Sequence, residues 1–355
     1  MKNDSRIDVV VVSSLVTHPL NRHVANGLAR AARSFPGLLS VRLVHPDMAL
    51  TDLRWSEVLP DLVIYMGSPA SGRMPVEQIG RAAADLSARS VFWSTEDPYE
   101  MDFAWRAEAY DLYVSNDANV AAAMVERMEG GLHLPLGACY EDLRPVRPPA
   151  SERVFFCGAP YQNREIFVDD FWARAKATGG PDLFVAGNGW DRVGQRVVAS
   201  PTSRQRLLEL QRSAGLALYL HRSLNLANRT RRLSATTPGP RLFETAMLGV
   251  PQIMEFFSFE IETYFTPGEE ILVARDGHEA ADLARELLSD PARAAGMARA
   301  AQRRAVAAHS WEHRLAALVG AALPDRAGGL KDALADIVAD RLRGLASDAE
   351  VPPAA

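Results

Sequence analysis

Cysteine is scarce in this chain, whose 355 residues include only Cys139 and Cys157. Each lies inside an apolar stretch, as buried structural thiols usually do. Two cysteines without clustered histidines exclude a disulfide framework and a structural zinc site. Long hydrophobic runs are also missing, because no stretch approaches the roughly 20 apolar residues of a membrane-spanning helix. The polar start at Met1–Asp8 has no apolar leader pattern, so we expect a cytoplasmic protein.

Lysine is almost absent, so nearly all positive charge is carried by arginine. The lysines are Lys2, Lys176 and Lys331. Lysine and arginine together number 39 against 44 acidic residues, which gives a formal net charge of −5. This mild acidity argues against a nucleic-acid-binding protein, which is usually basic. An anionic ligand of this protein must therefore be bound mainly by arginines and backbone amides.

Short apolar runs alternate with helical patterns along most of the chain. Continuous β-branched runs such as Val9–Val12 are typical of strands buried on both faces. Strand and helix in alternation predict βα units with parallel sheets, and the length favours two domains. The proline-containing stretch Leu143–Arg153 lacks periodicity and indicates a linker. We expect α/β domains at residues 1–145 and 151–328, followed by a C-terminal helix and polar tail at 329–355.

Parallel α/β sheets bind ligands beyond the carboxyl ends of their strands, so the loops there are the candidates for function. The segment Thr236–Pro251 is the most informative of these loops. A helix is expected to begin at Pro240, directly after Gly239, and its N-terminus favours a phosphate group. Arg241 adds a forked cation, and the carboxylate of Glu244 can accept hydrogen bonds from ribose hydroxyls. A capped helix with an acidic first turn explains the same residues, and both interpretations stay open.

Other polar residues follow predicted strands in both domains. His18, Glu96 and Asp97 come after strands of the first domain and are candidates for the base that activates an acceptor. A hydrogen-bonded loop histidine and a turn at Asp97 are the alternative interpretations. In the second domain, the small residues Gly187–Gly189 permit a close backbone approach. Trp190 either stacks on a nucleobase or packs in the core.

Several segments resemble GT-B glycosyltransferases, and more narrowly the bacterial spore-maturation-protein type. The helix segment with Pro240–Glu244 resembles that family's nucleotide-sugar loop. The resemblance extends from Trp93 to Leu323. Further matching segments, in chain order, are Trp93–Tyr99, Leu134–Ala138, Phe156–Gly158 with Asn163 and Arg164, Tyr264–Glu270 and His309–Arg314. The resemblance implies the GT-B fold, with two Rossmann-like domains whose parallel sheets face a central cleft.

The resemblance also implies that the second domain binds a nucleoside-diphosphate sugar. Glu244 matches the glutamate that holds the donor ribose, and Arg164 is the candidate for a diphosphate-binding arginine. The larger superfamily often has a second glutamate eight positions earlier, where this chain has Thr236. The arginine-rich stretch His221–Arg232 either helps to neutralise the diphosphate or is a solvated loop. The expected donor-binding residues are Gly158, Arg164, Gly187, Asn188, Trp190, Arg222, Thr236, Thr237, Gly239, Arg241, Leu242 and Glu244.

The expected function is therefore transfer of a sugar from a nucleoside-diphosphate donor to a small-molecule or glycan acceptor. Charge that develops on the departing diphosphate would be stabilised by amides and arginines. The resemblance implies no structural metal, and no suitable loop carries an Asp-x-Asp motif of the metal-binding kind, so we expect neither a metal nor a cofactor. A nucleotide-sugar epimerase of the same architecture and a non-catalytic nucleotide-sugar-binding protein are the alternatives. We expect no nucleic-acid partner and no integral membrane segment, and a homodimer is left open.

Overall fold

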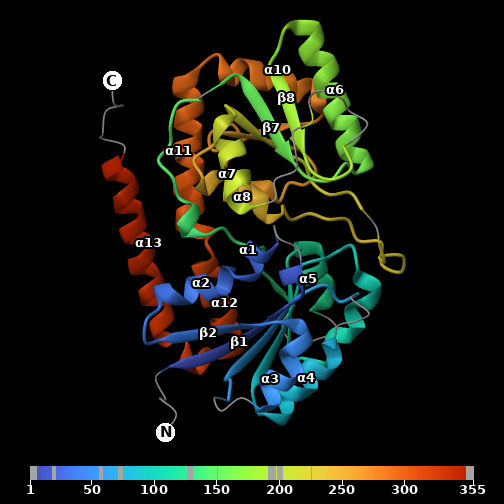
Figure 1. Cartoon of the computed structure of the whole chain (residues 1–355), viewed down its shortest axis with the longest axis vertical. Helices are drawn as coiled ribbons and strands as arrows, with labels where there is room; N and C mark the ends of the chain where they lie inside the picture. The colour runs from blue at the N-terminus through green and yellow to red at the C-terminus, as the bar shows by residue number, and fades with distance from the viewer. Residues whose placement is uncertain are drawn as a thin grey trace. The chain divides into compact units, whose positions relative to one another are not determined.

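The chain folds into two compact units, which are described in a computed structural model (Figure 1). The structure describes residues 6–17, 21–55, 59–70, 75–125, 131–149, 151–190, 197, 203–224 and 226–348. The first unit comprises residues 1–139, 225–237 and 310–340. The second comprises residues 140–224, 238–309 and 341–355. No helix within the described ranges combines the length and the hydropathy that crossing a bilayer would require.

A six-stranded sheet forms the centre of the first unit, in the order β2-β1-β3-β4-β5-β6. All neighbouring strands are parallel. The strands are β1 (Ile7–Ser13), β2 (Leu39–Val44), β3 (Leu62–Gly67), β4 (Arg89–Ser94), β5 (Leu112–Ser115) and β6 (Leu132–His133). Its helices are α1 (Arg22–Ala25), α2 (Gly27–Ala31), α3 (Ala49–Trp55), α4 (Val76–Asp85), the 3-10 helix η4 (Met101–Ala109), α5 (Ala118–Met124) and α12 (Trp311–Ala322).

Successive side chains of β1 alternate between two hydrophobic cores, one on each face of this sheet. Val9 and Val11 belong to the core that contains α2 and α12, and Val10 and Val12 belong to the core that contains α4. None of the four valines is more than 4% exposed. Helices on both faces therefore explain why this strand is a continuous apolar run rather than an alternating one.

A five-stranded parallel sheet forms the centre of the second unit, in the order β11-β10-β9-β7-β8. Counted from β7, this is the same order as the first five strands of the first unit, so the two units share a topology. The strands are β7 (Arg153–Cys157), β8 (Asp182–Ala186), β9 (Leu216–Tyr219), β10 (Gln252–Glu255) and β11 (Leu272–Ala274). The helices are α6 (Gln162–Thr178), α7 (Arg204–Ser213), α8 (Pro240–Met247), α9 (Ile261–Tyr264), α10 (Gly277–Leu288) and α11 (Pro291–Ala308). α6 and α10 pack against each other (Figure 1).

The predicted pair of parallel Rossmann-like domains is confirmed, but the chain divides between them differently from the predicted ranges. α12 lies in the first unit, although the sequence grouped it with the second domain. Trp311 at its start meets the ring of Trp93 edge to face, with 5.9 Å between ring centroids. Gly27 makes this packing possible, because a Cβ there would lie 2.3 Å from the Trp311 ring. The final helix, α13 (Gly328–Asp348), adds Leu330 to the same core.

Candidate functional site

The carboxyl edge of the second sheet is lined first by two glycines. Gly158 follows β7 and Gly187 follows β8, and the Gly158 amide donates to the carbonyl of Ala186 at 2.9 Å. Gly187 has a φ of +132°, and a Cβ at this position would lie 2.2 Å from the Gly158 carbonyl oxygen. The second βα turn can therefore approach the first this closely only because Gly187 lacks a side chain. Asn188 is exposed at the tip of the second turn.

Trp190 and Arg164 hold this edge together. The Trp190 ring is 1% exposed, and its Nε1 donates to the Gly158 carbonyl at 2.7 Å. Arg164 donates to the carbonyl oxygens of Ala159, Leu220 and His221 at 2.9–3.1 Å. The structure thus gives both side chains a role in fixing the turns. Their direct contact with a donor remains a prediction.

The N-terminus of α8 lies at the same edge. Pro240 is its first residue, as predicted, and Gly239 precedes it with an extended backbone. The Gly239 amide donates to the hydroxyl of Tyr219 at 2.6 Å. Leu242 is fully buried, which anchors the first turn in the core. The Arg241 side chain is 29% exposed, and its Nη1 donates to Glu244 Oε2 at 2.8 Å.

Glu244 lies in a buried network that the sequence analysis did not identify. Its Oε2 also lies 3.0 Å from Nη1 of Arg204, at the start of α7. Arg204 is in turn paired with Asp142, and the side chains of Asp142 and Glu244 are 7% and 3% exposed. The two carboxylates hold the pKa of Arg204 above its ordinary value, despite its burial. Arg204 precedes buried Leu207 and Gln211 by three and seven positions, which is the periodicity that places it on the inner helix face.

The charges of this network converge on the end of β7. Burial raises the pKa of the Cys157 thiol, whereas the positive charges of Arg241 and Arg164 oppose the rise and Glu244 adds to it. His221 follows near the end of β9. Its Nδ1 lies 2.8 Å from Glu255 Oε2, and the imidazole ring of His221 stacks on Phe257. The second sheet thus brings cations, a carboxylate and a helix N-terminus to one edge. Arg222 follows His221 in the same loop.

Thr236 and Thr237 belong to the first unit, where Asp117 binds them. The Asp117 carboxylate accepts hydrogen bonds from the amides of Thr236 and Thr237 at 2.7 and 3.1 Å, and it also caps α5. The Thr237 hydroxyl accepts from the amide of Ala118 and lies 3.0 Å from His133 Nε2. These contacts fix the stretch that leads into α8. A role for the two threonines in donor binding stays a prediction.

The later part of the arginine-rich stretch, residues 229–232, lies in the first unit as well. Asp102 on η4 accepts hydrogen bonds from the amides of Arg229 and Thr230 at 2.9 and 3.1 Å. Arg231 donates to the carbonyl of Ala123 at 3.0 Å. Arg232 donates to the carbonyl of Arg229. The side chains of Arg231 and Arg232 therefore hold backbone carbonyls of the first unit.

Asp97 lies at the carboxyl edge of the first sheet but is only 2% exposed. Its carboxylate accepts hydrogen bonds from the hydroxyls of Ser94, Tyr113 and Ser115 at 2.7–2.8 Å. Burial raises the pKa of Asp97 to about 6, although the three hydroxyl donors oppose the rise. Glu96 beside it is partly exposed, and His18 lies outside the described residues. The geometry favours a packing role for Asp97 and leaves Glu96 as the more accessible carboxylate.

The raised pKa of Asp97 predicts a pH-dependent stability. The unfolded chain loses this proton near pH 3.8 and the folded chain near pH 6, so folding is favoured by protonation and stability is lost as the pH rises between these values. Relative to Asp97→Asn, which does not titrate, the native protein should lose about 3 kcal/mol of unfolding free energy over this range. Urea unfolding of both proteins across the range measures the difference. Parallel pH profiles would contradict the prediction.

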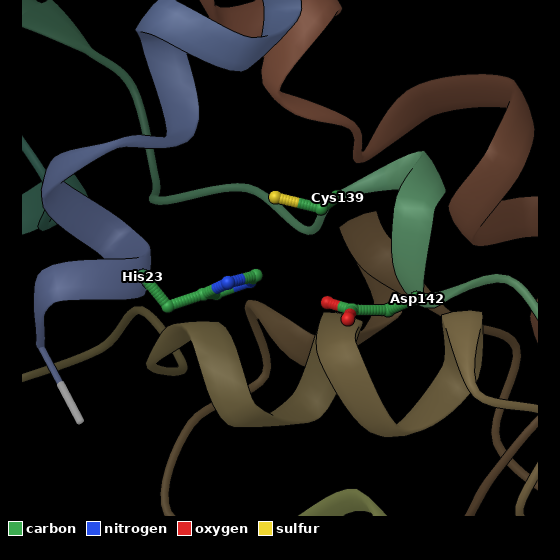
Figure 2. A group of neighbouring side chains, drawn as sticks. All are labelled: His23, Cys139 and Asp142. Atoms are coloured by element: carbon green, nitrogen blue, oxygen red, sulfur yellow. The ribbon is translucent and has the colours of Figure 1, made fainter. Parts of the chain in front are cut away.

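Two potential metal ligands of the first unit are paired with a cation instead. Figure 2 shows His23 and Cys139, whose ring nitrogen and sulfur are common transition-metal ligands. Nη1 of Arg30 lies 2.7 Å from His23 Nδ1 and 3.5 Å from Cys139 Sγ. A guanidinium at this position repels a metal ion, so the arrangement favours hydrogen bonding over ligation. Asp142, also labelled in Figure 2, is in the second unit and pairs with Arg204.

Comparison with known proteins supports the fold, and one family model matches part of the chain. Residues 164–320 match the family model described as glycosyl transferase-like. No curated protein matches the sequence. Among solved structures, HepE from Anabaena in complex with UDP and glucose is similar at 11% identity and a TM-score of 0.59, covering 88% of this chain and 98% of that one.

Two further structures have comparable similarity. A glycosyltransferase from Rickettsia africae gives a TM-score of 0.60 at 10% identity, covering 93% of this chain and 99% of that one. A protein assigned as a UDP-N-acetylglucosamine 2-epimerase from Listeria monocytogenes gives 0.54 at 12% identity, covering 89% and 96%. At these identities the likeness is one of fold. The chain thus has the two-unit Rossmann-like fold of GT-B glycosyltransferases.

Proposed function

We propose that this protein is a glycosyltransferase that moves a sugar from a nucleoside-diphosphate donor to an acceptor. The observation that carries the proposal is the meeting of the α8 N-terminus, Arg241 and Glu244 at the carboxyl edge of the second sheet. Residues 164–320, which match the glycosyl transferase-like family model, contain all three features. The order of the sequence motifs further supports the spore-maturation-protein type.

The residues at this edge fit the demands of a nucleoside-diphosphate leaving group. Charge develops on the diphosphate in the transition state, and a helix N-terminus with a guanidinium beside it stabilises that charge without a metal. We propose that Arg241 turns from Glu244 towards the diphosphate when the donor binds. Glu244 then keeps Arg204 as its partner and accepts hydrogen bonds from ribose hydroxyls.

Following a labelled donor tests the proposal and separates it from its alternatives. The full chain is incubated with a panel of nucleoside-diphosphate sugars, beginning with UDP-glucose, and with candidate acceptors. We expect label to pass to a second molecule, and to do so equally in EDTA. The epimerase alternative, favoured by the Listeria fold match, predicts isomerised donor and no transfer. Binding without conversion of any donor would instead identify a binding protein.

A further inference from the structure

A pocket of about 240 Å³ lies at the opposite edge of the second sheet. Its walls are the stretch Pro145–Pro149 and the two turns that lead into β9 and β10, at Arg212–Gly215 and Leu248–Pro251. These turns precede their strands, whereas the candidate donor-binding residues follow theirs. The pocket is therefore separate from the proposed donor site.

The linker that forms one wall of the pocket packs closely against the two turns that form the other walls. A Cβ at Gly215 would lie 2.0 Å from the Ser151 carbonyl oxygen and 3.2 Å from Pro149. Gly249 has a φ of +72°, and a Cβ there would lie 2.9 Å from the Val146 side chain. Both glycines thus let the linker pack directly on the turns. Prolines in the linker fix its backbone further, so the walls are preorganised.

Positive charge gathers at this pocket, whose lining contains Arg147 and Arg212 but no carboxylate among the described residues. The side chain of neither arginine forms an ion pair or hydrogen bond with any residue in the described ranges. Burial lowers the pKa of Arg212, and the positive charges of Arg147 and Arg144 lower it further. Arg144 itself donates to the carbonyls of Glu141 and Leu143. Like charges held together in a concave site raise the local affinity for an anion.

The donors that remain define the kind of anion. The amides of Gly215 and Gly249 already donate to the carbonyls of Arg153 and Ala246. The charged donors of the lining are therefore the guanidinium groups of Arg147, which is exposed, and Arg212, which is partly buried. A guanidinium matches the oxygens of a phosphate group with two parallel hydrogen bonds. The faces of Pro145 and Pro148 offer apolar contact to whatever the phosphate carries.

We propose that Arg147 and Arg212 bind a small phosphate-bearing ligand in this pocket, at a site distinct from that of the sugar donor. The chemistry that the pocket recognises is a phosphate group, either free or attached to a small organic molecule. Because the linker forms one wall, the bound ligand would hold the linker against the turns before β9 and β10. Binding therefore stabilises the second unit.

Calorimetric titration of the full chain with inorganic phosphate and with glucose 1-phosphate, at fixed ionic strength, tests this proposal. We expect Arg147→Gln and Arg212→Gln each to weaken phosphate binding by about tenfold or more, since each removes charge-assisted hydrogen bonds. Arg206→Gln is the matched control, because Arg206 lies on the same helix as Arg212 but pairs with Glu209. Thermal unfolding confirms that each variant is folded. Tighter binding of glucose 1-phosphate with the same dependence would identify an organic phosphate.

Arg241→Gln distinguishes the pocket from the donor site. Phosphate binding that survives this variant and is lost in Arg212→Gln supports the pocket, whether or not the protein transfers sugar. Phosphate binding that is lost in Arg241→Gln but unchanged in Arg147→Gln and Arg212→Gln would overturn the proposal. Absence of any phosphate binding to the native chain would also overturn it.

Discussion

Replacing Arg204 with methionine is expected to lower the free energy of unfolding by about 3–5 kcal/mol at neutral pH. Arg204 is the partner that Asp142 and Glu244 share, and both carboxylates are buried. Methionine keeps much of the side-chain volume but removes the guanidinium that the two buried carboxylates share. The cost is the lost compensation of their negative charge. Urea unfolding measures it.

The pH dependence of this loss provides the control. In Arg204→Met, Asp142 should take up a proton more readily when folded than when unfolded, so acidification should restore stability. The variant is therefore expected to approach the native protein as the pH falls towards about 4, near the carboxylate pKa values of unfolded chains. Adding Asp142→Asn should recover part of the loss at neutral pH. Arg204→Met with native stability at neutral pH would contradict the network.

Replacing Arg241 with glutamine is expected to weaken the binding of a nucleoside diphosphate by about 10- to 100-fold. The variant removes charge-assisted hydrogen bonds to the diphosphate, which are worth about 1.5–3 kcal/mol. Turnover should fall by at least as much, because these bonds strengthen as charge develops on the leaving group. Calorimetry with UDP and initial rates of transfer give the two values.

Two variants make this prediction specific. Arg275→Gln is the matched control, because Arg275 is an exposed arginine of the same unit that pairs with Glu279. It should leave both UDP affinity and turnover unchanged. Arg241→Lys keeps the charge but not the forked geometry, and should recover only part of the affinity. Equal UDP affinity in the native protein and in Arg241→Gln would remove Arg241 from the donor site.

The sequence predicted the strands and their parallel arrangement because burial on both faces leaves a strong local pattern. The apolar run Val9–Val12, for example, lies within β1, between β2 and β3 in the first sheet. The start of α8 could also be predicted, since Gly239 and Pro240 are local signals for a helix N-terminus. Features encoded within a few residues could therefore be predicted.

Contacts between distant parts of the chain could not be predicted in the same way. The amides of Thr236 and Thr237 bind Asp117, about 120 positions earlier, and no local pattern specifies that partner. Arg204 and Glu244 are likewise joined only by the fold. Trp190 shows a different limit of sequence analysis. Its position allowed the ring either to stack on a nucleobase or to pack in the core, and only the structure shows that the ring is buried.

A crystal structure of the full chain with UDP would show whether the start of α8 binds the donor. We expect density for the diphosphate at the N-terminus of α8 with Arg241 turned towards it, and ribose hydroxyls within hydrogen-bond distance of Glu244. Density for UDP elsewhere, with solvent at the start of α8 and Arg241 still paired with Glu244, would contradict it.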